Sequence, residues 1–277
     1  MKMASPLESS SCETAVQVTA ASKKYPNGTQ ALLPVTLSIK QGEFVSLLGP
    51  SGCGKSTLLK MIAGLTAPTN GSIDLWPRQT RNLNHENTTQ PEINKSAPRL
   101  SFVFQSPTLM PWATVRANTR LPLDLAGVSK DEGNSRVDKV LQSVGLFDFA
   151  DYLPRALSGG MQMRVSIARG LVTEPSILLM DEPFGALDEI TRHKLDADLL
   201  MLWQKKNLTI IFVTHSIHEA VYLSSKVIMM AARPGRITEE IVIDQPYPRN
   251  PEFMVTSEFA RYAGLLQRSL LNASQTN

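Results

Sequence analysis

The sequence contains very few cysteines. Its 277 residues include two, Cys12 and Cys53, and these lie far apart. Small extracellular domains without a large core are held together by several disulfides, so two distant cysteines exclude a disulfide framework. We therefore expect a protein of a reducing compartment.

Long apolar runs are missing as well. The best ones, residues 209–213 and 226–232, have the length of strands, whereas a membrane-spanning helix needs about 18 consecutive apolar residues. Residues 1–13 are rich in serine and carry an acidic residue where a secretory signal has its apolar core. We expect this segment to be disordered, and nothing in the sequence predicts export or a membrane anchor.

Clustered charge of one sign is a third absence. The 28 basic and 25 acidic residues give a formal net charge of +3, and no run of Lys or Arg stands out. Proteins that bind nucleic acid usually carry a concentrated basic patch, so we expect no nucleic-acid partner. The length allows one large α/β domain with a modest appendage, or two small domains.

Strand-like and helix-like patterns alternate along much of the chain. Short apolar runs predict strands, and a period of 3.6 residues predicts helices. The predicted strands are residues 44–48, 101–105, 177–180, 209–213 and 227–231, and the predicted helices are 55–65, 189–205 and 217–223. This order predicts an α/β fold with a mostly parallel sheet covered by helices.

Other parts of the chain have their own patterns. Residues 14–48 alternate apolar and polar side chains around turns, which is typical of β structure. Residues 106–170 are largely helical, whereas 76–98 are polar without a period and predict a flexible insertion. Residues 245–277 read as a Pro-rich hinge followed by an amphipathic helix.

A glycine-rich loop lies between the strand 44–48 and the helix that follows it. Residues 49–56 fill every fixed position of a phosphate-binding loop, in which backbone N–H groups and the helix N-terminus face the phosphates. Lys55 would neutralise phosphate charge and Ser56 would bind Mg²⁺. A plain Gly-rich turn is disfavoured because strand and helix are both in place. The expected nucleotide contacts are Gly49, Pro50, Ser51, Gly52, Cys53, Gly54, Lys55, Ser56 and Thr57.

Two predicted strands end in polar side chains that suit nucleotide hydrolysis. The strand 177–180 leads into Asp181 and Glu182, and the next strand leads into His215. Parallel strands bring their carboxyl ends to one edge of a sheet. We expect Asp181 to bind Mg²⁺, Glu182 to activate water and His215 to sense the γ-phosphate. The alternatives are acids that end a strand in solvent and a histidine that caps a strand.

Three more side chains carry weaker signals. Gln105 ends its own short strand and is a candidate for Mg²⁺ or water, and Tyr25 is a candidate for stacking on adenine. Cys53 lies inside the phosphate loop, where we expect its side chain to lie near the nucleotide and its alkylation to block binding.

A second glycine-rich segment, residues 157–161, lacks a lysine and reads as half of a phosphate site. Ser158 is placed to cap a helix that begins at Gly159 and Gly160, whose exposed N–H groups would form an anion site. An ordinary capped helix start is the alternative. Two different half-sites in one chain suggest that two copies meet to form a complete site.

Taken together, these segments resemble the nucleotide-binding subunit of ABC transporters, from about residue 16 to 244. The resemblance implies a P-loop NTPase core of RecA type with an antiparallel β subdomain and an inserted helical subdomain. It implies a head-to-tail homodimer in which each ATP lies between Lys55, Asp181, Glu182 and His215 of one subunit and residues 158–160 of the other. Glu182 would be the base, Gln105 the link to the membrane partner and Tyr25 the adenine-stacking residue.

Finer features resemble the nitrate, sulfonate and taurine import branch of that family: residues 109–112, 180–188, 232–237 and the Pro-rich tail. The resemblance implies uptake of a small anion, foremost aliphatic sulfonates, with taurine and nitrate as alternatives. It also implies two transmembrane permease subunits, a periplasmic or extracellular solute-binding protein and a peripheral position on the cytoplasmic face of the inner membrane. The sequence departs from the pattern at Ser216, at Met163 and in the length of 76–98.

Two other classes of protein remain as alternatives. Soluble ABC ATPases that act on nucleic acid or ribosomes usually have two ATPase domains or a coiled-coil insertion, and this chain has neither pattern. A phosphate-loop kinase or GTPase would leave the segment 157–161 without a purpose.

Overall fold

The structure, a computed structural model, describes residues 13–75 and 99–275. Residues 1–12, for which we predict disorder, and the insertion 76–98 lie outside the described residues. The strands are β1 (Thr14–Lys24), β2 (Gln30–Lys40), β3 (Phe44–Leu48), β4 (Asn70–Leu75), β5 (Leu100–Val103), β6 (Ile177–Asp181), β7 (Thr209–Thr214), β8 (Lys226–Ala231) and β9 (Arg236–Val242). The helices are α1 (Lys55–Ile62), α2 (Val115–Leu125), α3 (Lys130–Ser143), α4 (Gly159–Leu171), α5 (Glu189–Lys206), α6 (Ile217–Leu223) and α7 (Ser257–Gln275).

The larger sheet has the strand order β5-β6-β7-β3-β8-β9. Its first five strands are parallel, and only β9 runs antiparallel to its neighbour. Strands β3, β6 and β7 are buried along their whole length, as expected when helices or a second layer cover both faces. The predicted parallel α/β sheet is confirmed.

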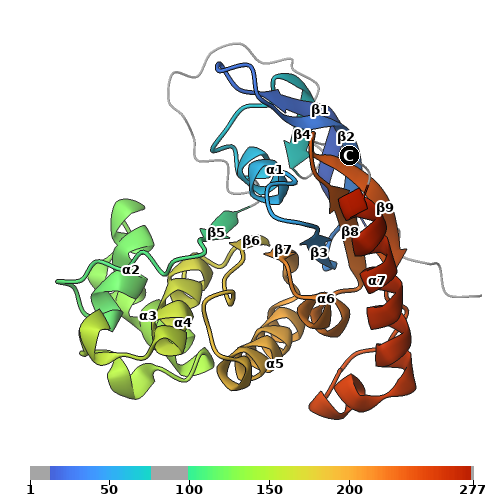
Figure 1. Ribbon diagram of the computed structural model, residues 1–277. Coiled ribbons are helices and arrows are strands. Elements are labelled where there is room, and N and C mark those ends of the chain that lie inside the picture. The colour runs from blue at the N-terminus through green and yellow to red at the C-terminus, as the bar shows by residue number, and fades with distance from the viewer. Residues whose placement is uncertain (1–12, 76–98, 276–277) are drawn as a thin grey trace, which may run out of the picture.

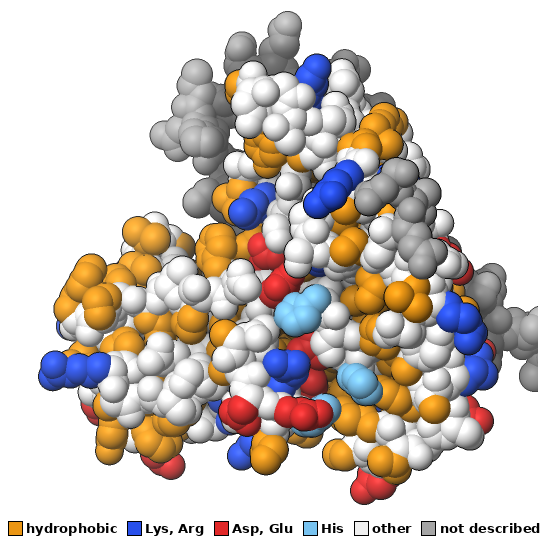
Figure 2. All heavy atoms as spheres, in the orientation of Figure 1, with side chains coloured by type: hydrophobic (Ala, Val, Ile, Leu, Met, Phe, Trp, Pro, Cys, Tyr) orange, Lys and Arg blue, Asp and Glu red, His pale blue; other side chains and the backbone are white. Residues whose placement is uncertain are grey.

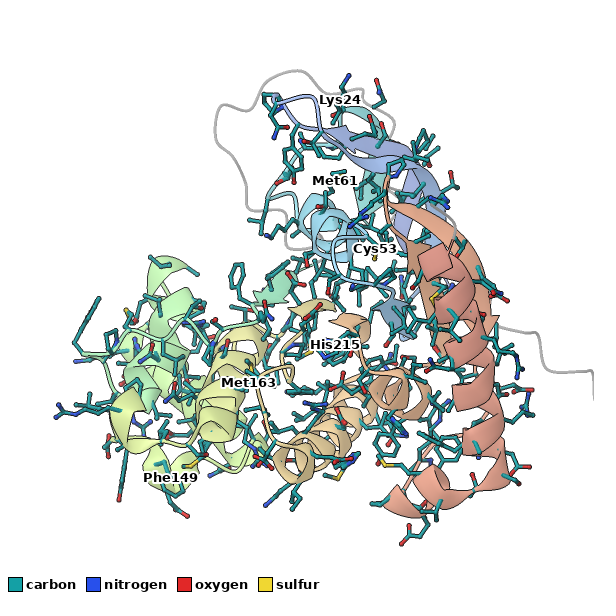
Figure 3. The ribbon with its side chains drawn as sticks, viewed as in Figure 1. Lys24, Cys53, Met61, Phe149, Met163 and His215 are labelled. Atoms are coloured by element: carbon teal, nitrogen blue, oxygen red, sulfur yellow. The ribbon has the colours of Figure 1, made fainter. Side chains whose placement is uncertain are left out.

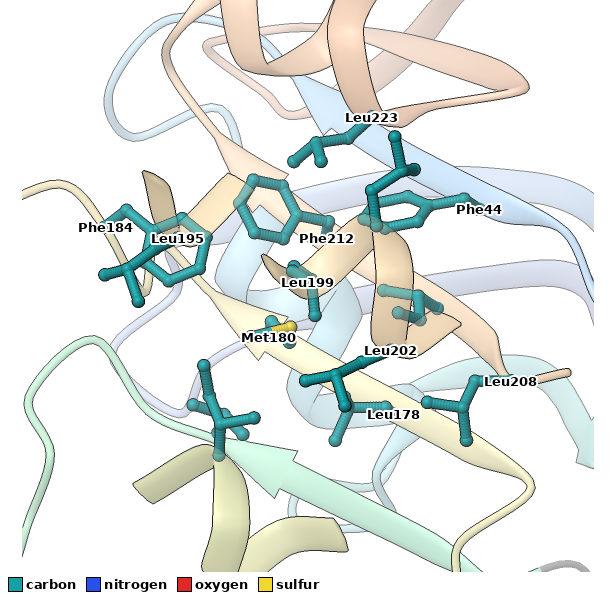
Figure 4. Close-up of a cluster of buried hydrophobic side chains, with 14 of the residues drawn as sticks. Phe44, Leu178, Met180, Phe184, Leu195, Leu199, Leu202, Leu208, Phe212 and Leu223 are labelled. Carbon is teal, nitrogen blue, oxygen red and sulfur yellow. The ribbon is translucent and has the colours of Figure 1, made fainter. Parts of the chain in front are cut away.

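Each inner strand of this sheet supplies two hydrophobic cores, because successive side chains point to opposite faces. Leu178 and Met180 of β6 pack in one core with Phe44 and Phe212, beneath α5 and α6 (Figure 4). The alternate residues of the same strands, among them Leu179, pack in the other core with α1 and the smaller sheet. The sheet is therefore held rigidly from both sides, which fixes the positions of its strand ends.

Two further units project from this body (Figure 1). Strands β2-β1-β4 form an antiparallel sheet, and helices α2, α3 and α4 form an arm on the other side. The sequence patterns did not single out β4, which is mostly exposed, or α2, which contains Pro122. The predicted cap at Ser158 is confirmed, because its hydroxyl accepts from the Met161 N–H at 3.3 Å. The Ser129 hydroxyl caps α3 in the same way and accepts from the Glu132 N–H at 3.4 Å.

The C-terminal segment packs on the body. Phe259, Tyr262 and Leu266 of α7 are buried, as the amphipathic pattern predicts. The Pro-rich segment before α7 is tied down by Arg249, which is 4% exposed. Its guanidinium donates to the carbonyl oxygens of Val221, Tyr222, Ser224, Ile243 and Gln245. Among the described residues, no helix combines the length and apolar character needed to cross a membrane.

Candidate functional site

The carboxyl ends of three adjacent strands form the floor of the site. Strands β6, β7 and β3 are neighbours, with Asp181 opposite Val213 and Leu48 opposite Thr214. The residues that follow each strand therefore emerge side by side at one edge of the sheet. Figure 3 shows His215 in the inner angle of the molecule, between the helical arm and α7.

The loop between β3 and α1 has the backbone of a phosphate cradle. Gly52 and Gly54 have φ values of +78° and +92°, which favour glycine. A Cβ on Gly49 would lie 2.3 Å from the Met230 carbonyl oxygen, so no larger residue fits there. Lys55 is 5% exposed, and its ammonium donates to the carbonyls of Gly49 at 2.8 Å and Pro50 at 3.1 Å. The loop thus holds a positive charge at its centre.

Ser56 and Asp181 meet at the end of the sheet. The Ser56 hydroxyl donates to Asp181 Oδ1 at 2.7 Å. Burial raises the pKa of the Asp181 carboxyl, and the hydrogen bond from Ser56 opposes this shift. A hydroxyl beside a carboxylate is an oxygen donor set that suits Mg²⁺, which takes few protein ligands and completes its shell with phosphates and water. No cluster of three or more His, Cys, Asp or Glu that could hold a metal occurs in the described part of the chain.

Glu182 and His215 lie next to this pair. The Glu182 Oε2 atom is 3.4 Å from His215 Nδ1, and the two side chains are 24% and 55% exposed. The backbone of Glu182 has a φ of +46°, a strained value for a non-glycine residue, and its N–H donates to the Val213 carbonyl at 3.0 Å. The strand end therefore turns sharply, and the carboxylate of Glu182 projects to the histidine.

Ser216, at the position where the family usually has aspartate, caps helix α6. Its hydroxyl accepts from the Glu219 N–H at 3.3 Å, and its own N–H donates to the Thr214 hydroxyl at 2.9 Å. The turn that carries His215 is thus held on both sides, although the aspartate is replaced.

Behind this turn lies a buried carboxyl that we did not predict from the sequence. Glu219 is 5% exposed, accepts a hydrogen bond from the Thr214 hydroxyl and lies 3.7 Å from Arg192 Nε. Burial raises its pKa, and burial raises the pKa of nearby Asp196 well above its ordinary value. An acidic residue within the apolar helix 217–223 was the available signal.

The second glycine-rich segment lies at the start of α4, in the helical arm. Ser158 and Gly159 are exposed, whereas Gly160 is buried, and a Cβ added to it would lie 2.7 Å from Thr191 Cγ2. In the described residues, no hydrogen bond or ion pair joins this segment to Lys55 or Asp181. The exposed half of the segment faces outward within this single chain.

Three weaker candidates have different outcomes. Tyr25 is 38% exposed in the β1–β2 turn, with the Lys23 ammonium 5.6 Å from its ring centre. From the sequence we predict that Gln105 ends its strand. Strand β5 instead ends at Val103, and Gln105 lies exposed two residues beyond it. Val103 pairs with Met180, which places Gln105 at the same sheet edge as Glu182.

The Cys53 side chain points into the core beneath the phosphate loop. The residue is fully buried, its Sγ lies 3.8 Å from Lys55 Nζ, and it belongs to the core cluster that contains Leu32 and Met230. Burial raises the pKa of the thiol. The positive φ values on both sides, at Gly52 and Gly54, turn this side chain beneath the loop.

Comparison with known proteins agrees with this geometry. A protein-family model described as ABC transporter matches residues 32–185. This chain belongs to the ABC transporter family. The predicted family, fold class and ATPase activity are therefore confirmed: the chain binds and hydrolyses ATP.

Two curated relatives of this ABC ATPase carry transport functions in their names. An aliphatic sulfonates import ATP-binding protein of Pseudomonas savastanoi pv. phaseolicola is 45% identical over 225 residues, which are 80% of this chain and 84% of that protein. A bicarbonate transport ATP-binding protein of Synechococcus elongatus is 44% identical over 234 residues, which are 82% of this chain and 33% of that protein.

Solved structures match most of the chain. The dimeric structure of a bacterial ABC transporter cassette has a TM-score of 0.69 and 34% identity, and the match covers 83% of this chain and 100% of that one. The same cassette has also been solved as a dimer in a post-hydrolysis state with ADP and inorganic phosphate, with the same TM-score and identity.

Proposed function

We propose that this chain is the ATP-hydrolysing subunit of an importer for a small anion, foremost aliphatic sulfonates. The observation that carries the ATPase part is the row of Ser56–Asp181 and Glu182–His215 contacts at one sheet edge, directly behind the phosphate loop. The relative named for sulfonate import supports the cargo, and the relative named for bicarbonate transport supports the wider class of small anions. Taurine and nitrate remain the alternatives within that class.

In the proposed mechanism, two copies enclose each ATP head to tail. The loop amides and Lys55 bind the phosphates, Tyr25 stacks on adenine, and residues 158–160 of the second copy close the site. The exposed Ser158 and Gly159, which have no partner from the phosphate loop of their own chain, support this arrangement. Mg²⁺, held by Ser56, Asp181 and Gln105, would neutralise phosphate charge.

Glu182 is the proposed general base. Its carboxylate takes a proton from water as the water oxygen attacks the γ-phosphorus; the bond to the ADP oxygen breaks, and ADP and inorganic phosphate are released. His215, 3.4 Å from Glu182, orients the carboxylate and contacts the γ-phosphate. The strained backbone at Glu182 supports this role, because such strain is concentrated at functional sites.

The helical arm is the proposed contact with two transmembrane permease subunits. Large hydrophobic side chains are exposed around it, among them Phe104, Trp112 at 78%, Leu125 at 81%, Phe147 and Tyr152. Figure 2 shows hydrophobic side chains spread over this arm. Exposed apolar groups of this kind mark interaction surfaces. In this proposal the chain lies on the cytoplasmic face of the inner membrane, and a solute-binding protein delivers the anion from the other side.

Growth of a deletion strain tests the cargo. Cells that lack this chain should fail to grow on an alkanesulfonate as the sole sulfur source, and the wild-type gene should restore growth while a Glu182→Gln gene should not. Normal growth on alkanesulfonate, with a defect on taurine, nitrate or low bicarbonate instead, would replace sulfonate by that anion. A chain that stays out of the membrane fraction when co-expressed with its permeases would favour a soluble ABC ATPase.

A further inference from the structure

Arg169, near the end of α4, joins the signature helix to the segment that follows Gln105. Its Nη1 donates to the Thr108 carbonyl at 2.9 Å, and its Nη2 donates to the Pro107 carbonyl at 2.8 Å and to the Thr108 hydroxyl at 2.9 Å. Nη2 also reaches the Ser166 hydroxyl of the same helix at 3.4 Å. One side chain thus satisfies three acceptors on two consecutive residues.

The contact does not serve to pair charges. Among the described residues, every hydrogen-bond partner of the Arg169 guanidinium is a neutral oxygen, and no carboxylate forms an ion pair with it. Partial burial lowers the pKa of this guanidinium. The Arg169 guanidinium therefore stays in a partly desolvated place, where it binds the backbone carbonyls of Pro107 and Thr108. The planar, forked arrangement of its N–H donors suits arginine to this task.

Thr108 is the residue that needs this support. Its φ is +46°, in the left-handed region, where a β-branched side chain is a clear outlier. Such a conformation persists only when its surroundings impose it. Two of the three bonds that Arg169 makes to this segment end on Thr108 itself, so the arginine helps to hold this conformation.

Gln105 lies between two attachments to the same end of α4. On one side, the Ser101 hydroxyl of β5 donates to the Gly170 carbonyl at 2.7 Å, next to Arg169 in sequence. On the other side, Arg169 holds Pro107 and Thr108. Gln105 is the middle of three exposed residues, Phe104 to Ser106, in the short span between them, so its position depends on where α4 lies.

We propose that Arg169 is a positioning residue: through Pro107 and Thr108 it sets the place of Gln105 at the ATP site and makes Gln105 move together with the signature helix. The inference rests on the proposed role of Gln105 at the nucleotide. Helix α4 begins at Gly159 and is capped by Ser158. The three hydrogen bonds from Arg169 to Pro107 and Thr108, which we call the clamp, therefore connect two half-sites. One is the segment 158–160, which would contact ATP in the second subunit, and the other is Gln105 in the chain's own site.

A double-mutant cycle on the full-length protein tests the proposal. We expect Gln105→Ala and Arg169→Met each to lower ATP turnover by about fivefold or more, with the KM for ATP changed by less than about twofold, because Lys55 and the loop are untouched. In the Gln105→Ala background, Arg169→Met should cause little further loss, because both changes act on the same group.

The control is Arg120→Met. Arg120 also makes three hydrogen bonds within the helical arm, to Asp124, the Lys130 carbonyl and Asn134, but none toward Gln105. The Arg120→Met variant should lower the unfolding temperature about as much as Arg169→Met does, yet leave ATP turnover unchanged. If Arg169→Met does not fold, Arg169→Lys takes its place, since one ammonium cannot match the fork.

The possible outcomes separate the two proposals. If Gln105→Ala slows turnover but Arg169→Met does not, the clamp is refuted while the role of Gln105 stands. If the losses multiply in the double mutant, Arg169 acts independently of Gln105 and the inference is overturned. If Gln105→Ala has no effect on turnover, the proposed role of Gln105 fails, and the inference fails with it.

Discussion

Replacing Gly160 by alanine tests how the signature helix is seated on the body. The new Cβ would lie 2.7 Å from Thr191 Cγ2 in the first turn of α5, whereas carbon atoms pack best at about 3.5–4.0 Å. Overpacking of this kind costs about 1–3 kcal/mol, and alanine recovers up to about 1 kcal/mol through its helix propensity. With a net loss of about 1–2 kcal/mol, the unfolding temperature should fall by about 2–6 °C.

A second substitution can remove the clash itself. Thr191→Ser deletes only the methyl group that the new Cβ would strike, so the double variant Gly160→Ala/Thr191→Ser should regain most of the lost stability. Gly159→Ala is the matched control: its Cβ would lie 3.5 Å from Leu187 Cδ2, an ordinary contact, and stability should not fall. The assay is thermal unfolding followed by circular dichroism. If Thr191→Ser gives no recovery, the contact inferred between α4 and α5 is wrong.

Three other experiments probe the phosphate loop and the buried core behind the site. Lys55→Ala should weaken ATP binding about ten- to a hundredfold, as expected for a lost charged hydrogen bond. The control is Lys60→Ala, which changes an exposed lysine of the same helix and should leave ATP binding unchanged. Equal affinities of the two variants for ATP in a titration would refute the role of the loop. Thiol labelling of Cys53, mapped by mass spectrometry so that it is distinguished from labelling of Cys12, should be far slower in the folded protein than in denaturing urea. Stability contributed by Asp196 is present below its unfolded pKa of about 4 and is lost as the pH rises through its raised folded pKa. Asp196→Asn should therefore flatten the pH dependence of the unfolding temperature and stabilise the protein most at high pH. An unchanged slope of unfolding temperature against pH would contradict this.

Much of the fold could be predicted because the apolar pattern is strong where the chain is buried on both faces. Strand β3 and helix α6 begin and end where the sequence predicts, and β6 and β7 differ by one residue at an end. The pattern is silent where elements are exposed, as in β4, or where a helix contains proline and buries polar side chains, as α2 does with Pro122, Asn118 and Thr119. Periodicity reports burial, so weakly buried elements give no signal.

Site residues were predicted when a fixed spacing carries them, as with Lys55, Ser56, Asp181 and Glu182. The direction of the Cys53 side chain was not, because it depends on the positive φ values of its two glycine neighbours and on the core below. Arg169 was also missed: its partners Pro107 and Thr108 are distant in sequence, and only the folded chain brings them to it.

The central claim is that two copies of this chain, each with half of the site, must enclose ATP before hydrolysis. The most direct measurement is size-exclusion chromatography of Glu182→Gln with and without ATP, beside wild type and Glu189→Gln, which changes an exposed acid in α5. A missing general base slows turnover about 10²- to 10⁴-fold, so the variant should accumulate as an ATP-dependent dimer while Glu189→Gln behaves like wild type. A Glu182→Gln protein that remains monomeric with bound ATP, or that hydrolyses ATP at the normal rate, would contradict the account.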